Sequence, residues 1–364
     1  MQGMTHVSAT SPAGMSRRAL LIGTLAGWWT SAAHALPLRT LVFPRDFGSH
    51  PDLRTEWWYM TGHAEAGTRM FGFQLTFFRS RVDVAQSLQS GFAARQLIFA
   101  HAAVTDLEGR RLWHDQRIAR AGFGVADADI RNTAVQLRDW SLRREDSGLY
   151  VAWLPANGFA LDLRLRPRQS LLLQGQAGLS RKGPDSEQAS YYYSEPQLDT
   201  RGTITLKGNR FDVHGTAWLD HEWSEALLHR EAVGWDWIGM NLDDGGALTA
   251  FRLRRADGSA LWFGGSLRNA DGRLRTFGPA DLNFEAERRW TSPRSNTTYP
   301  TRWRLQTPAG VFTVNALLDD QELDSSSSTG AIYWEGLSEL LDAGGRRVGR
   351  GYLEMTGYAR RLQL

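Results

Sequence analysis

Short runs of alternating apolar and polar residues, separated by turns that contain glycine, extend over most of the chain. In residues 71–77 every second side chain is large and apolar, which is the pattern of a strand that buries one face. Residues 56–62 are predicted to pair with this strand through a turn at Ala66-Gly67-Thr68. Further strands are expected at residues 96–105, 111–120, 134–143, 149–154, 159–166, 202–207 and 211–218. So many short strands predict an all-β sandwich or barrel.

A second series of similar strands follows residue 234. Its members are expected at residues 235–242, 247–254, 259–267, 299–306, 310–316, 332–337 and 351–358. Turns at residues 243–245, 256–258 and 270–272 each end in glycine and separate the earlier members. Because the two series look alike, they predict two β domains at residues 36–225 and 226–364, with the boundary inside residues 224–232.

The first 35 residues have the pattern of a twin-arginine export signal. Arg17 and Arg18 precede a modestly apolar run that ends in the small-residue site Ala33-His34-Ala35. The run is shorter than the roughly 20 apolar residues that a membrane-spanning helix needs, so a membrane anchor is the less favoured alternative. We therefore expect cleavage after Ala35 and a periplasmic or secreted protein. The chain contains no cysteine, which excludes disulfides and thiolate metal ligands.

Charge and aromatic content narrow the classes of partner. The 42 basic and 39 acidic residues give a formal net charge of +3, and removal of Arg17 and Arg18 would leave 3 − 2 = +1. Scattered charges of this kind give no electrostatic signature for nucleic acid, which we exclude as a partner. Fifteen tryptophans instead indicate aromatic walls around an apolar small molecule such as an isoprenoid or lipid. Transient contact with a membrane surface is compatible with such a ligand, and the oligomeric state is left open.

The most informative segment is residues 215–244, where carboxylates lie among tryptophans. If residues 213–222 are extended, Trp218, Asp220 and Glu222 share one face, whereas Leu219 and His221 share the other. The face that carries Leu219 is typical of a core, and the opposite face is typical of a cavity wall. A carboxyl group held against indole rings is poorly solvated, which raises its pKa toward the range of a general acid. Asp220 is the candidate acid; the alternative is a carboxylate that caps a turn or pairs with an arginine.

Several motifs resemble the AttH and carotenoid 1,2-hydratase (CrtC) superfamily, and the closest likeness is to its secreted AttH-like branch. They are His50-Pro51, Thr55-Glu56-Trp57-Trp58-Tyr59, Trp218-Leu219-Asp220-His221-Glu222-Trp223-Ser224, Gly234-Trp235-Asp236-Trp237, Tyr333-Trp334-Glu335-Gly336 and Gly351-Tyr352-Leu353-Glu354. The resemblance implies two consecutive lipocalin-like (calycin) β-barrels. The hydratase branch adds water to a terminal carbon–carbon double bond of an acyclic carotenoid without a cofactor.

The resemblance also implies roles for individual residues. The proposed proton donor of the hydratases is an Asp two residues after a Tyr, and Asp220 falls on that position, although Trp218 replaces the Tyr. The hydratases carry an upstream His-x-Trp pair where this chain has Tyr191-Tyr192-Tyr193. With Asp220 as the acid, the catalytic candidates that orient water or relay its proton are His221, Asp236 and Tyr193. The ligand-binding candidates are Trp57, Trp58, Trp218, Trp223, Trp235, Trp237 and Glu56.

Other chemistries match the sequence less well. His214, His221, Glu222 and His229 are close in sequence, but they lack the helical H-E-x-x-H spacing of a metal site, so no metal and no cofactor is expected. A serine hydrolase is disfavoured because no G-x-S-x-G motif occurs. Plain barrel core remains the alternative for the aromatic residues, and pairing with an arginine remains the alternative for Glu56. The sequence therefore predicts an exported binder of an elongated apolar molecule, either a hydro-lyase, a carrier or an envelope accessory protein.

Overall fold

The computed structural model describes residues 35–362, in which two antiparallel β-sheets form one compact unit. The predicted export signal lies outside these residues except for Ala35. The first sheet contains β1 (Thr55–Ala66), β2 (Arg69–Arg81), β3 (Gln96–Asp106), β4 (Arg111–Arg120), β5 (Ala126–Ala128), β6 (Ala134–Leu137), β7 (Trp140–Arg144), β8 (Tyr150–Ala156), β9 (Phe159–Arg166), β10 (Leu172–Leu173), β11 (Leu179–Arg181), β12 (Ala189–Leu206) and β13 (Asn209–Ala226).

The second sheet contains the remaining strands. They are β14 (Gly234–Leu242), β15 (Ala247–Arg254), β16 (Ala260–Arg268), β17 (Leu274–Phe277), β18 (Asn283–Thr291), β19 (Thr298–Thr307), β20 (Gly310–Ala316), β21 (Glu322–Ser325), β22 (Ala331–Leu341) and β23 (Arg347–Met355). Two short helical turns, η1 (Arg45–Phe47) and α1 (Asp83–Gln86), complete the elements of the described residues. None of the helices within residues 35–362 is long and apolar enough to cross a membrane.

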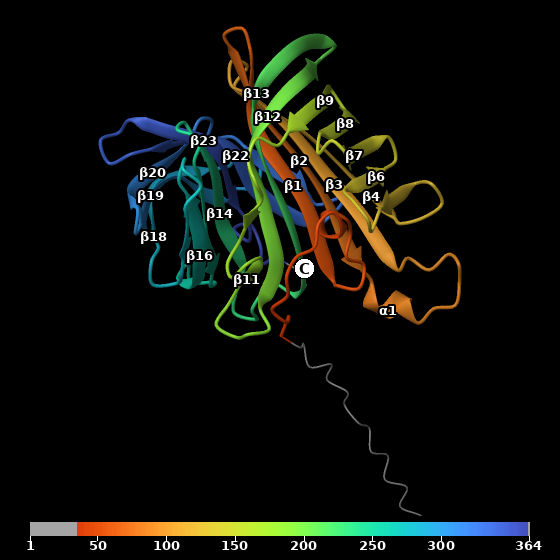
Figure 1. The fold of residues 1–364 in the computed structure, drawn as a ribbon. Helices are drawn as coiled ribbons and strands as arrows, with labels where there is room; N and C mark the ends of the chain where they lie inside the picture. Colours follow the sequence, from red (N-terminus) through yellow and green to blue (C-terminus); the bar gives the residue numbers. More distant parts are fainter. Residues whose placement is uncertain (1–34, 363–364) are drawn as a thin grey trace, which may run out of the picture. The chain divides into compact units, whose positions relative to one another are not determined.

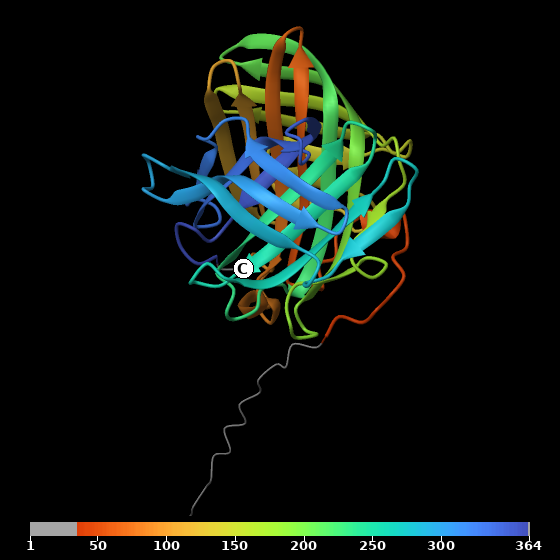
Figure 2. The same cartoon turned by 90° about the vertical axis from the view of Figure 1, so that its left-hand side faces the viewer.

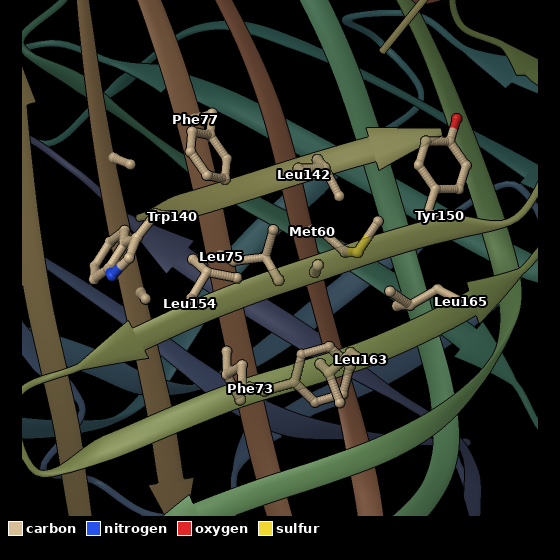
Figure 3. Packing of buried hydrophobic residues seen from close by; sticks show 14 of the residues in the cluster. Met60, Phe73, Leu75, Phe77, Trp140, Leu142, Tyr150, Leu154, Leu163 and Leu165 are labelled. Atoms are coloured by element: carbon tan, nitrogen blue, oxygen red, sulfur yellow. The ribbon is translucent and has the colours of Figure 1, made fainter. Parts of the chain in front are cut away.

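The first sheet curls so that its two ends approach each other. Its strand order is β4-β3-β2-β1-β13-β12-β9-β8-β7-β6-β5. At the seam, Arg117 of β4 donates a hydrogen bond to the Pro155 carbonyl of β8 at 2.9 Å, and its guanidinium lies 4.4 Å from the centre of the Trp140 ring of β7. Strands β7–β9 cross steeply over β1–β3, and apolar side chains from both groups fill the space between them (Figure 3).

The second sheet has its own apolar interior. Its order is β17-β16-β15-β14-β23-β22-β20-β19-β18, and β21 pairs with β22. Across the open side, Phe263 of β16 stacks on Phe284 of β18 with the ring centres 6.0 Å apart. Trp303, Trp334 and Met355 are among the side chains buried inside. The prediction of an all-β protein with two consecutive lipocalin-like barrels is confirmed. The first sheet ends at Ala226 and the second begins at Gly234, while the exact domain limits stay a prediction.

Most of the predicted strands are present, with instructive differences. Residues 111–120 and 159–166 form β4 and β9 with the predicted limits. The strand predicted at 134–143 is instead a hairpin, β6 and β7, with a turn at Arg138, whose φ is 57°. Strands β17 and β18 were not predicted, because most of their side chains are exposed and the alternation of apolar residues is weak. Strands β12 and β13 are each 18 residues long, far longer than the predicted segments within them.

Strands β1, β2, β12 and β13 lie between the second sheet and the short strands β6–β9 (Figure 1). After a quarter turn, the strands of the second sheet lie in front of β1 and β13 (Figure 2). One face of β1 and β13 therefore belongs to the first barrel core, which contains Met60 and Leu219. Their other face contributes Tyr59 and Trp218 to the apolar cluster between the sheets.

A buried carboxylate, Glu56, ties three parts of the first barrel together. Its oxygens accept hydrogen bonds from Arg79 Nε of β2 at 2.8 Å and from the Ser49 hydroxyl at 2.8 Å, and they contact ring nitrogens of His50 and His221 at 2.8 and 2.9 Å. Burial alone would raise the pKa of Glu56. The hydrogen bonds and charges of the two histidines outweigh that cost and hold its pKa well below the usual value. Glu56 is thus ionised and fixes the segment before β1 against β2 and β13.

We expect Glu56→Ala to destabilise the protein by about 3–5 kcal/mol, because removal of the anion leaves Arg79 buried without its carboxylate partner. Urea unfolding of the chain from residue 36 onward, followed by tryptophan fluorescence, measures this free energy. Glu108→Ala is the matched control, since that side chain is 70% exposed and its change should cost less than about 0.5 kcal/mol. Equal stability of the two variants would show that the network does not hold the barrel together.

Candidate functional site

A cavity of about 310 Å³ lies between the two sheets, on the outer face of each barrel. Its walls come mainly from β1, β2, β3 and β13 on one side and from β14, β15, β22 and β23 on the other. Most of the lining is apolar, with Trp57, Phe78, Phe99, Trp235, Trp237, Phe251, Leu97, Leu227, Leu253 and Ile332. A wall of this composition is suited to contact with apolar groups.

Strand register brings polar side chains into two facing rows at this cavity. On the first sheet, Asp220 of β13 is directly opposite Tyr59 of β1, which is opposite Thr76 of β2. On the second sheet, Trp237 of β14 is opposite Glu354 of β23, which is opposite Glu335 of β22. Directly opposed side chains on one face of a sheet have Cβ atoms about 4.5–5.5 Å apart. Residues far apart in sequence are therefore neighbours in this site.

The carboxyl group of Asp220 is held in one orientation by three donors. Its Oδ1 accepts hydrogen bonds from the Ser194 hydroxyl at 2.5 Å and from Trp218 Nε1 at 2.6 Å, and its Oδ2 accepts one from the Tyr192 hydroxyl at 2.6 Å. Burial raises the pKa of Asp220 to about 7, more than these three bonds lower it. Oδ1 already has two donors, so Oδ2 is the position for the proton of the neutral acid.

Two further acids, Glu335 and Glu354, lie side by side on the second sheet. Burial raises the pKa of Glu354 to about 7, and the charges of Asp220 and Glu222 add to the increase, although Trp235 Nε1 donates a hydrogen bond to Glu354 at 3.0 Å. Burial and the neighbouring Glu354 raise the pKa of Glu335 well above its usual value. The cavity thus contains several carboxyl groups that retain protons near neutral pH.

Glu222 is another cavity carboxylate with a cationic partner. Lys182 Nζ lies 2.9 Å from Glu222 Oε1, and the Ser190 hydroxyl donates to the same oxygen. The ammonium group also lies over the rings of Tyr192 and Phe251, at 4.6 and 4.3 Å from their centres. This arrangement fixes the segment around Lys182 against the cavity wall.

The structure brings only part of the predicted site together. Asp220, Trp57, Trp235 and Trp237 line the cavity, and Trp218 contacts it indirectly through its hydrogen bond to Asp220. His221, Tyr193, Trp58 and Trp223 lie on the opposite face of the first sheet. There His221 stacks on Trp58 and its Nδ1 lies 3.1 Å from the Tyr193 hydroxyl.

Asp236 was predicted to be catalytic and Glu56 to bind the ligand, but in the structure both carboxylates are bound to arginine side chains. Asp236 is inside the second barrel, where Arg252 Nε and the Tyr358 hydroxyl donate to it at 2.7 and 2.8 Å. Glu56 borders the cavity, but its carboxylate is occupied by the network described above, including Arg79. The structure thus gives both residues an arginine partner, which was the alternative considered for Glu56.

His50, Glu56 and His221 place nitrogen and oxygen atoms within 4.8 Å of one another, which is close enough for metal ligands. Their existing contacts, however, account for both histidine rings. His50 Nε2 lies 3.0 Å from Asp46, His221 Nδ1 lies near Tyr193, and the remaining nitrogens face Glu56. The guanidinium of Arg79 is bound to the same carboxylate, and a second cation beside it would be repelled. The group fits an ion-pair network better than a metal centre.

Sequence reasoning missed Tyr59, Tyr192, Glu335 and Glu354 as site residues. Tyr59, Glu335 and Glu354 lie in the motifs that carry the family resemblance, but no local pattern marked them as cavity residues. Alternation along each strand would have shown that Glu335 shares a face with Tyr333, and Glu354 with Tyr352. Their meeting with Asp220 depends on the packing of one sheet on the other, which has no local signature in the sequence.

Fold and site define a protein of two lipocalin-like barrels with an acid-lined apolar cavity between them. The chain belongs to the AttH-like family, whose model matches residues 34–358. It is similar to the solved structure of an AttH protein from Nitrosomonas europaea, with 47% identity and a TM-score of 0.84 over 89% of this chain and 99% of the other.

Kievitone hydratases are also related to this chain. One from Fusarium solani subsp. phaseoli is 21% identical over 228 residues, which cover 58% of this chain and 60% of the relative's length. The crystal structure of kievitone hydratase from Nectria haematococca has a TM-score of 0.69 at 15% identity, over 91% of this chain and 95% of that one. At that identity the structural likeness shows a shared fold.

We expect Glu354→Gln to gain stability relative to the wild type as pH rises from 5 to 8. The folded pKa of about 7 exceeds the unfolded value, so the native state holds more protons and loses stability as pH rises through this range. The amide cannot ionise, so the difference in unfolding free energy should shift by on the order of 2–3 kcal/mol. Urea unfolding at several pH values measures it, with the exposed Glu285→Gln as control. A pH-independent difference would contradict the raised pKa.

Proposed function

We propose that this protein is a cofactor-independent hydro-lyase that adds water to a carbon–carbon double bond of an elongated apolar molecule, with Asp220 as the proton donor. The observation that carries the proposal is the buried Asp220 carboxyl at an apolar cavity, with a pKa raised to about 7. An acid of this strength is partly protonated near neutral pH and is matched to proton transfer there. The relationship to kievitone hydratase supports this class of reaction.

Protonation of an alkene requires an acid that stays close to an apolar group and a wall that tolerates positive charge. Ser194, Trp218 and Tyr192 hold the Asp220 carboxyl in place, so little reorganisation is needed when the proton leaves. Trp57 and Trp237 line the same cavity, and an aromatic face stabilises a nearby cation by about 0.5–2 kcal/mol. A substituted double bond that forms a tertiary cation is the substrate group that this arrangement favours.

The proposal extends to the ligand and the place of action. An isoprenoid or lipid-like molecule suits the aromatic walls, and the twin-arginine motif at Arg17 and Arg18 supports action in the periplasm or outside the cell. A carrier that binds such a molecule without changing it is the second candidate, because the apolar lining favours binding whether or not a reaction follows.

Asp220→Asn should reduce hydration at least 100-fold and leave ligand affinity within a few fold, because the amide keeps the shape of the side chain but not its acidic proton. Incubation with geraniol and farnesol in oxygen-18 water, with mass spectrometry of the products, measures label incorporation. Wild-type activity should fall as pH rises through about 7, since the acid must hold its proton. Chelators should have no effect.

Asp212→Asn is the matched control, because Asp212 lies on the same strand with its side chain 87% exposed. The Asp212→Asn variant should hydrate geraniol and farnesol at the wild-type rate. Binding of both alcohols by the wild type without label incorporation would favour the carrier. Full activity of Asp220→Asn would show that another group is the acid.

A further inference from the structure

Among the buried polar groups at the cavity that make no hydrogen bond of 3.5 Å or less within residues 35–362, two lie close to each other on opposite sheets. They are the hydroxyl of Tyr59 on the first sheet and Oε1 of Glu335 on the second sheet. Both residues line the cavity, and they are only 6% and 2% exposed. Buried polar groups are nearly always hydrogen-bonded in native proteins, and two neighbouring groups that are too far apart for a good bond to each other can both bond to one small oxygen placed between them.

Strand pairing and ring packing connect these two residues to the candidate acid. Tyr59 is directly opposite Asp220 in the ladder between β1 and β13, and its ring meets the Trp237 ring edge-on with the centres 5.2 Å apart. Trp237 is opposite Glu354, which is in turn opposite Glu335. Glu335 and Tyr59 are close enough for a weak mutual hydrogen bond to contribute to the pKa of each. Tyr59 is therefore a shared neighbour of Asp220 and Glu335.

Protonation states indicate which chemical group would fit. Burial raises the pKa of both Tyr59 and Glu335 well above their usual values, and the nearby carboxylates Glu335 and Glu354 raise that of Tyr59 further. At neutral pH each group can therefore donate one hydrogen bond and accept another. A neutral hydroxyl or water oxygen also does both, whereas a cation would leave the donors unused. The pair is suited to a neutral oxygen.

We propose that Tyr59 and Glu335 form an oxygen-binding subsite, which holds the water molecule that attacks the protonated alkene and, after the reaction, the hydroxyl group of the product. This inference rests on the proposed hydration and adds the position of the nucleophile. Asp220 transfers its proton to one alkene carbon, and the water oxygen bonds to the other, now cationic, carbon. The proton that leaves the resulting oxonium returns to the Asp220 carboxylate, the base that the first step creates at the same cavity. The acid is thereby restored, and no other reactant is needed.

A binding experiment tests the subsite without requiring turnover. Tetrahydromyrcenol, a saturated tertiary terpene alcohol, and the alkane of the same carbon skeleton are compared by quenching of tryptophan fluorescence. The wild type should bind the alcohol about 10-fold more tightly than the alkane, and Tyr59→Phe and Glu335→Met should reduce this preference to about 2-fold. Glu335→Gln, whose amide also donates and accepts, should retain most of the preference.

Ser80→Ala is the control for this comparison, because Ser80 also lines the cavity and its change removes a hydroxyl away from Tyr59 and Glu335. It should keep the wild-type preference. Unchanged preference in Tyr59→Phe and Glu335→Met would overturn the subsite, as would an equal loss in Ser80→Ala. Circular dichroism of each variant confirms that the barrels are folded before affinities are compared.

A second experiment separates this inference from the proposed hydration. With geraniol in deuterium oxide, the wild type should give the deuterated tertiary alcohol. Tyr59→Phe and Glu335→Met should form the cation but capture water at least 10-fold more slowly, so the cation loses a proton and returns alkene that carries deuterium. Wild-type rates of hydration in both variants would overturn the subsite. If the wild type neither hydrates nor exchanges, the proposed function fails, while the binding comparison still decides whether the subsite exists.

Discussion

Burial of β1 and β13 on both faces is the constraint on which the site depends. Successive side chains of a strand point to opposite sides, so Asp220 and His221 are sent into two different interiors. His221 joins Glu56 in the first barrel, whereas Asp220 joins Tyr59 at the cavity between the sheets. A shift of the register by one residue would exchange the two sets and bury every group among the wrong neighbours. The Glu56 network opposes such a shift, because it joins β1 to β2 and β13 by side-chain contacts.

The two interiors hold carboxyl groups in opposite protonation states for a simple physical reason. Glu56 and Glu335 are equally deprived of water, with exposures of 1% and 2%. Glu56 has Arg79 and two histidines as partners, which stabilise its anion. Around Glu335, the charged group that acts on its pKa is another carboxylate, Glu354, which favours the neutral acid. The partner set, and not burial alone, decides which carboxyl group is a structural anion and which can donate a proton.

The sequence predicted the all-β class and the separation of Asp220 from His221, because both follow from alternation along single strands, whereas the two lipocalin-like barrels were implied by the family resemblance. The same alternation contained information that the choice of site residues did not use. Trp223 is two residues from His221, so it lies on the same face of the strand as His221 and not on the face of Asp220. It stacks on His50 in the first barrel. Asp236 lies between Trp235 and Trp237, so it points into the second barrel while both tryptophans face the cavity. These residues were assigned to one site because they are close in sequence. The alternation of side chains along each strand instead places them in two different environments.

Contacts between the two sheets could not be predicted in this way, because they depend on how two separate outer faces pack. The way these faces pack also determines where a cavity is left in the structure. Lipocalin-like barrels offer their interiors as natural ligand sites, yet here large side chains such as Trp140 and Trp334 fill both. A cavity of about 310 Å³ lies between the barrels, with Asp220 and Tyr59 from one and Glu335 and Trp237 from the other. Any separation of the sheets would admit water to these carboxyl groups and lower their pKa values, so the packing of the two barrels determines how strongly these groups hold their protons.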